Sequence, residues 1–147
     1  MALLEIFNFL HFIGLAYGLG GATIATIISI KADKDVELGK QVMKIIPSIS
    51  KLIWFGLLLL IISGIGISFL VSWPVNKQLL IVKHVLVVWI IIFGIVIGFK
   101  VKKLKKLAPK SREQPSIQFL KTKKQLKFFS IINLLLWYLI ILLSVFA

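Results

Sequence analysis

The chain contains no cysteine, which excludes disulfide bonds, thiolate-bound metals, iron–sulfur clusters and covalently attached c-type haem. Acidic residues are also scarce, because the 147 residues include 5 Asp and Glu against 18 Lys and Arg. The apolar segments carry no nucleophile–base pair, paired carboxylates or phosphate-binding loop, so nothing supports hydrolytic chemistry. The N-terminal stretch lacks the basic start and cleavage site of a signal peptide, so we expect the first apolar segment to be retained.

What the sequence does contain is long apolar stretches. Hydrophobic residues make up 59% of the chain and charged residues 16%, against about 45–50% and about 25% in soluble domains. This composition predicts an all-α integral membrane protein. At about 20 residues per span, the chain forms one four-helix domain over residues 1–147, with spans at about 4–30, 51–72, 78–99 and 128–146. A short interfacial helix is expected over residues 36–46.

Lysine placement predicts the topology. Five lysines lie between the first two spans and ten lysines plus Arg112 lie between the last two, whereas the middle connection holds only Lys77. By the positive-inside rule, the two basic loops are cytoplasmic and both termini are extracytoplasmic, in a multi-pass protein of the plasma membrane. Because topology accounts for the net charge of +13, no nucleic-acid partner is expected.

Two histidines, His11 and His84, are the only ones in the chain, and both fall inside apolar spans. An ionisable side chain in such a segment is a candidate functional site by default. The first and third spans run in the same direction, and each histidine lies about six or seven residues into its span. The two rings should therefore lie at one depth, near the outer face, as axial ligation of a planar haem requires.

Small residues follow each histidine on its own helix face. Gly14 and Gly18 lie on the side of His11, and Gly94 lies on the side of His84. One interpretation is that these faces make room for a macrocycle, so that Gly14→Leu would lose haem before it loses the fold. The other is that small-x-x-x-small patterns let membrane helices pack closely without any ligand.

Several polar side chains could support the histidines. Asn8 lies above His11 and could fix its tautomer. Lys83 sits beside His84 and either pairs with a haem propionate or extends to the outer surface. The last span carries a stripe that we expect to face the bundle core, formed by Ser130, Asn133, Trp137 and Ser144.

The ligand inventory favours haem over a bare metal ion. Copper(I) prefers sulfur ligands, but Met1 and Met43, the only methionines, are poorly placed. Zinc normally needs three or four protein ligands. Haem b needs only two nitrogens in an apolar slot, so we expect His11 and His84 to be its iron ligands.

The same residues resemble a known group, the small four-helix membrane proteins around the copper-resistance protein CopD and the HemJ type of protoporphyrinogen oxidase. The similar motifs are His11-x-x-Gly14 followed by Gly20-Gly21, Trp54-x-Gly56 through Ile62-Ser-Gly-Ile65, and Lys83-x-x-Leu86-Val-Val. The HemJ branch implies bound b-type haem, with functional residues that correspond to His11 and Lys83. The CopD branch implies copper handling.

The leading hypothesis is a membrane b-type haem protein that acts in electron transfer or redox chemistry. One alternative is a protoporphyrinogen oxidase-like enzyme, and the other is a copper transporter or a non-enzymatic assembly subunit. Membrane lipid is the expected surrounding partner. A redox partner, a porphyrin substrate and a second copy of the chain remain open.

Overall fold

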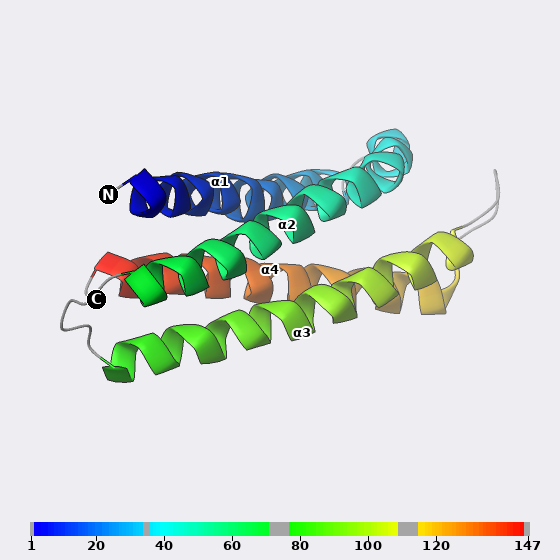
Figure 1. Cartoon of the computed structure of the whole chain (residues 1–147). Coiled ribbons are helices and arrows are strands. Elements are labelled where there is room, and N and C mark those ends of the chain that lie inside the picture. The colour runs from blue at the N-terminus through cyan, green and yellow to red at the C-terminus, as the bar shows by residue number, and fades with distance from the viewer. Residues whose placement is uncertain (1, 34–35, 71–76, 109–114, 146–147) are drawn as a thin grey trace.

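The computed structural model describes residues 2–33, 36–70, 77–108 and 115–145, and all its regular structure is helical. Four helices follow in order: α1 (Ala2–Lys31), α2 (Val36–Leu70), α3 (Lys77–Leu107) and α4 (Ile117–Val145). Each is long and apolar enough to cross a bilayer. The predicted four-helix membrane fold is thus confirmed at this level. Figure 1 shows the helices side by side, with α1 beginning and α4 ending at the same end of the bundle.

The interior is small and the outside is apolar. α1 packs along α2 and α4, and α3 packs along α4. A compact core joins all four helices through Ala22, Leu57, Ile90 and Trp137. Large side chains such as Phe12, which is 71% exposed, point outward. An apolar exterior suits contact with lipid rather than water, as expected of a membrane bundle.

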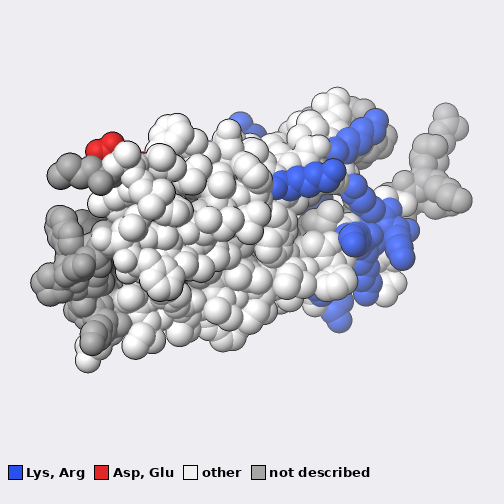
Figure 2. Space-filling model, viewed as in Figure 1, with Lys and Arg blue, Asp and Glu red and all other residues white. Residues whose placement is uncertain are grey.

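Charge divides the bundle into two ends. On the face shown in Figure 2, lysines gather at the end where α1 leads into α2 and α3 into α4, and the rest of the described part of that face is nearly uncharged. We call this the lysine-rich end and the opposite one the lysine-poor end.

Along the helices, hydroxyl groups donate to carbonyl groups of their own helix. Thr26 donates to the carbonyl of Ala22 at 2.8 Å, and Ser29 donates to that of Ala25 at 2.7 Å.

α2 is longer than the predicted span, because residues 36–46, predicted as a short interfacial helix, are its first turns and Pro47 lies inside it. Figure 1 shows these turns lying across the direction of the remaining helix. Proline removes one backbone donor and its ring clashes with the preceding turn, which bends a helix without ending it. The predicted end at residue 72 lies outside the described residues.

α3 and α4 also extend beyond their predicted spans, to Leu107 and from Ile117. Lysine is a good helix former, so the basic sequence continues both helices past the apolar segment. The two extensions pair, since Lys100 Nζ donates to Gln125 Oε1 at 2.6 Å and Leu104 and Thr122 are buried. The predicted end of the last span at residue 146 lies outside the described residues.

Candidate functional site

His11 is held by a residue of another helix. Its Nδ1 lies 2.9 Å from Oγ of Ser63 on α2. Ser63 has no exposed surface, and its hydroxyl donates to the Leu59 carbonyl at 2.6 Å. A hydroxyl has only one proton, so while that proton is donated to Leu59, Ser63 Oγ accepts from the histidine. The proton of His11 is therefore on Nδ1, and Nε2 carries the lone pair.

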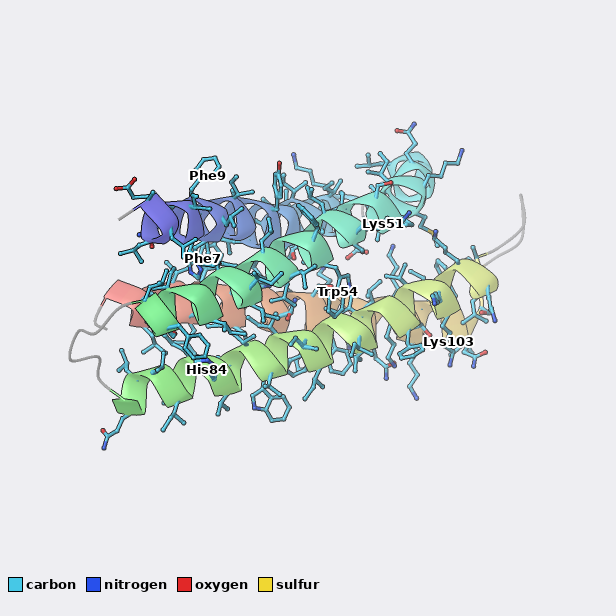
Figure 3. The ribbon with its side chains drawn as sticks, viewed as in Figure 1. Phe7, Phe9, Lys51, Trp54, His84 and Lys103 are labelled. Atoms are coloured by element: carbon cyan, nitrogen blue, oxygen red, sulfur yellow. The ribbon has the colours of Figure 1, made fainter. Side chains whose placement is uncertain are left out.

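His84 has the same tautomer for a different reason. Its Nδ1 lies 2.8 Å from the backbone carbonyl of Leu80, one turn earlier on α3. A carbonyl oxygen only accepts, so Nδ1 must donate and Nε2 again carries the lone pair. The ring is exposed, whereas that of His11 is partly buried. Figure 3 shows His84 at the same end of the bundle as Phe7, which lies one turn before His11 on α1.

Lys83 adds a positive charge to this end. It directly precedes His84 on α3, and its side chain is partly buried. No carboxylate pairs with Lys83 among the residues that the structure describes. Placing a cation in an apolar segment without a counterion costs free energy. Lys83 is therefore a candidate partner for an anionic ligand group.

Gly14 and Gly18 of α1 face other helices. A Cβ on Gly14 would lie 2.8 Å from the carbonyl oxygen of Gly56 and 2.9 Å from Leu60 on α2. A Cβ on Gly18 would meet the ring of Trp137 on α4. Both glycines thus bring helices together, as the packing interpretation describes, and protein atoms fill the faces expected to lie against a macrocycle.

The other predicted site residues are spread more widely. Asn8 is exposed and makes no hydrogen bond within the described residues. Gly94 lies beside Trp54 of α2, where a Cβ would be 3.2 Å from that ring, about 15 Å along α3 from His84 at 1.5 Å per residue. The structure therefore joins His11 to Ser63, whereas among the described residues Asn8 has no hydrogen bond to this pair and Gly94 lies farther along the bundle.

Ser63 was not among the predicted site residues. The sequence holds one signal for it, a serine within a long apolar run at the depth of the histidines, but which face of α2 meets α1 is set only in the folded bundle. Of the predicted α4 stripe, Asn133 and Trp137 are buried as expected, and Ser144 is exposed.

A bare metal site is not assembled from the residues described: no group of three or more His, Asp or Glu side chains lies close enough to hold an ion. Haem is less demanding, because two nitrogen ligands suffice. The described residues include two candidate nitrogen donors, His11 on α1 and His84 on α3. The glycine-bearing faces of α1 do not form a binding surface for haem, because α2 packs against Gly14 and α4 packs against Gly18.

Comparison with known proteins adds no assignment, since no family model, curated protein or solved structure matches the chain.

Proposed function

We propose that this protein is a multi-pass membrane haem protein in which His11 and His84 provide axial nitrogens to one b-type haem at the lysine-poor end. The observation that carries the proposal is the shared tautomer. Each Nδ1 proton is donated to an oxygen, at 2.9 Å in His11 and 2.8 Å in His84, and each Nε2 keeps its lone pair. Metal-bound histidines in proteins typically have their other ring nitrogen fixed in this way.

The remaining parts of the site have supporting roles. Ser63 fixes the ring orientation and tautomer of His11 from the buried side of α2. Lys83 supplies a positive charge that suits a propionate carboxylate. When bound, haem would provide one-electron redox chemistry, which places the protein in electron transfer or a related reaction.

The proposal includes an orientation. The lysine-rich end faces the cytoplasm of a cell whose plasma membrane holds the protein, because basic loops are retained on the cytoplasmic side. The histidines then lie toward the outer face. Cysteine substitutions in the connection at residues 109–114 should react with a membrane-impermeant thiol reagent only after the cells are opened.

Absorption spectra of the purified, haem-supplemented protein test the ligation. We expect a Soret band with the signature of low-spin, six-coordinate iron. His11→Ala and His84→Ala should each give a five-coordinate spectrum, and the double variant should lose haem. Phe12→Ala is the matched control, because Phe12 is next to His11 on α1 and points outward. A protein without a Soret band, or spectra unchanged in both histidine variants, would reject the proposal.

A second candidate, a protoporphyrinogen oxidase-like catalyst at the same place, is favoured by Lys83, which is next to His84 and pairs with no carboxylate among the described residues. A porphyrin substrate carries carboxylates that such a lysine binds. Complementation of a strain that lacks this oxidation separates the two functions. Growth that is lost in Lys83→Gln and in His11→Ala would support the enzyme. Absence of growth with the intact protein would leave only the electron-transfer role.

A further inference from the structure

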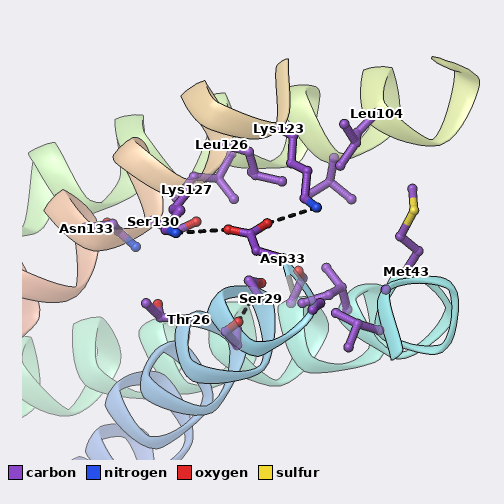
Figure 4. A pocket seen from close by; sticks show the side chains of 18 of the residues that line it. Thr26, Ser29, Asp33, Met43, Leu104, Lys123, Leu126, Lys127, Ser130 and Asn133 are labelled. Atoms are coloured by element: carbon purple, nitrogen blue, oxygen red, sulfur yellow. Dashed lines mark hydrogen bonds and ion pairs between the residues drawn. The ribbon is translucent and has the colours of Figure 1, made fainter. Parts of the chain in front are cut away.

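A separate cavity lies at the other end of the bundle. Its volume is about 520 Å³, and residues from all four helices line it. Neither His11 nor His84 is among them. Figure 4 shows the space between the α1–α2 side and the α3–α4 side, toward the lysine-rich end. Sites for small organic ligands typically measure about 300–1,000 Å³, so the cavity has the size of a ligand site.

The walls are mainly apolar. They include Ile53 and Trp54 from α2, Ile90 and Ile97 from α3, and Leu126 from α4. Such walls favour a hydrocarbon or ring system over a polar ligand.

One buried polar group in the wall is unsatisfied. Asn133 is 8% exposed, and its Oδ1 has no hydrogen-bond partner among the residues that the structure describes. Ser130, one turn earlier on α4, also lines the space. A buried amide oxygen without a partner costs about 1–3 kcal/mol, so a donor from a ligand or a water is expected at this point.

Positive charge gathers at the other part of the wall. Asp33, just beyond α1, lies 2.9 Å from Lys123 and 2.9 Å from Lys127, which are one turn apart on α4 (Figure 4). Partial burial acts to raise the pKa of Asp33, but hydrogen bonds and charge from the two lysines outweigh it, so the pKa lies below its ordinary value. One carboxylate thus faces two ammonium groups, which leaves one positive charge and several N–H donors for another anion.

We propose that this cavity binds an amphipathic acid. Lys123 and Lys127 pair with its carboxylate or phosphate head, a single hydrocarbon chain lies between the helix pairs, and the far end of the chain reaches Asn133. Charge complementarity, apolar walls and the unsatisfied amide all point to such a molecule. Lys127 and Lys123 lie about 9 and 15 Å from Asn133 along α4, so the chain is of medium length. A hydroxyl at its end would donate to Asn133 Oδ1.

Quenching of tryptophan fluorescence by brominated probes tests the proposal in phosphatidylcholine nanodiscs. The probes are 11-bromoundecanoate, 11-bromoundecyl phosphate and the uncharged 11-bromoundecanol. We expect saturable quenching by one or both acids, and the stronger of the two identifies the head group. Trp54→Phe should remove most of the saturable signal, because Trp54 lines the cavity. Quenching that rises linearly for all three probes would overturn the proposal.

Charge variants separate a binding site from general attraction to a basic surface. The double variant Lys123→Gln/Lys127→Gln should weaken acid binding by at least about tenfold. Lys121→Gln/Lys124→Gln removes the same charge from α4 outside this cavity and should change binding little. Equal losses in the two double variants would overturn the proposal.

Asp33→Asn distinguishes binding from a structural role of the lysines. If Lys123 and Lys127 hold the ligand, removing the competing carboxylate frees both ammonium groups, and acid binding should tighten several-fold. If the lysines act only by joining α4 to α1, Asp33→Asn breaks the same ion pairs and should weaken binding, as the lysine variants do. The second result would reject the proposal. A probe that carries a terminal hydroxyl, 12-hydroxydodecanoate, should compete better than dodecanoate, and Asn133→Leu should remove this preference.

Discussion

Nδ1 of His11 and Oγ of Ser63 lie 2.9 Å apart across the interface between α1 and α2, although 52 positions separate the two residues in the sequence. The serine is fully buried, and its hydroxyl proton is already donated to Leu59. In this arrangement the histidine donates to the serine. It links the close packing of two helices to the protonation state of a proposed iron ligand.

Ser63→Ala should weaken haem binding. The substitution leaves the Nδ1 proton of His11 without its acceptor and allows the other tautomer, which places a proton on Nε2. Loss of such a supporting hydrogen bond typically costs about 10–100-fold in metal affinity. The rate of haem transfer to excess apomyoglobin measures the effect. Ser68→Ala is the control, because among the described residues that exposed hydroxyl bonds only the Gly64 carbonyl of its own helix. Equal transfer rates in the two variants would contradict the assigned role of Ser63.

Gly56→Ala should destabilise the bundle, and Gly64→Ala in the same helix should not. A Cβ on Gly56 would meet the backbone nitrogen of Gly18 and lie 2.7 Å from the carbonyl oxygen of Gly14, whereas nothing lies within 4 Å of one on Gly64. Backbone atoms cannot move aside as a flexible side chain can, so we expect a loss of about 1–3 kcal/mol or more at Gly56. Gly64→Ala should be neutral or gain up to about 1 kcal/mol from helix propensity. Reversible unfolding in mixed micelles measures both changes.

Asp33→Asn should lower stability at neutral pH and have no effect in acid. The ion pairs with Lys123 and Lys127 hold the pKa of Asp33 below its ordinary value, so its stabilising contribution is fully present above the unfolded-state pKa of about 3.9 and is lost as the pH falls through the folded-state pKa. Because these pairs are partly exposed, each is worth about 0.2–1 kcal/mol at most. Unfolding curves at pH 7 and below pH 3 provide the comparison, with Glu5→Gln as control. A difference that persists in acid would show that the charge is not its cause.

The number and type of the helices followed from composition because lipid requires long, continuous apolar segments. The ends of the helices were predicted less well from the sequence. α3 continues past the apolar run because lysine favours helix. Contacts with α4 also stabilise this extension, since Lys100 donates a hydrogen bond to Gln125 and Leu104 is buried. Those contacts depend on which helices are neighbours, and a single sequence does not state this.

Within the site, spacing in the sequence predicts a common depth for the two histidines, but it could not predict the contacts of the glycine faces. Gly14 meets Gly56, and Gly18 meets Trp137, because α2 and α4 both pack on α1. We now expect Gly14→Leu to disturb the fold together with any haem site, not after it. The cavity at the lysine-rich end could not be read from spacing, because all four helices contribute to its walls.

Lys83→Gln should lower the midpoint reduction potential of the proposed haem. A fixed positive charge favours the reduced iron, which carries one charge less than the oxidised iron, and no described carboxylate neutralises Lys83. Because Lys83 is next to the proposed ligand His84, loss of its charge should shift the potential by on the order of tens of millivolts. Lys100→Gln is the matched control, about 25 Å farther along the same helix at 1.5 Å per residue. Potentiometric titration should show a shift for Lys83→Gln, little for Lys100→Gln and recovery with Lys83→Arg. Equal shifts at both positions would mean that the haem does not lie at the lysine-poor end.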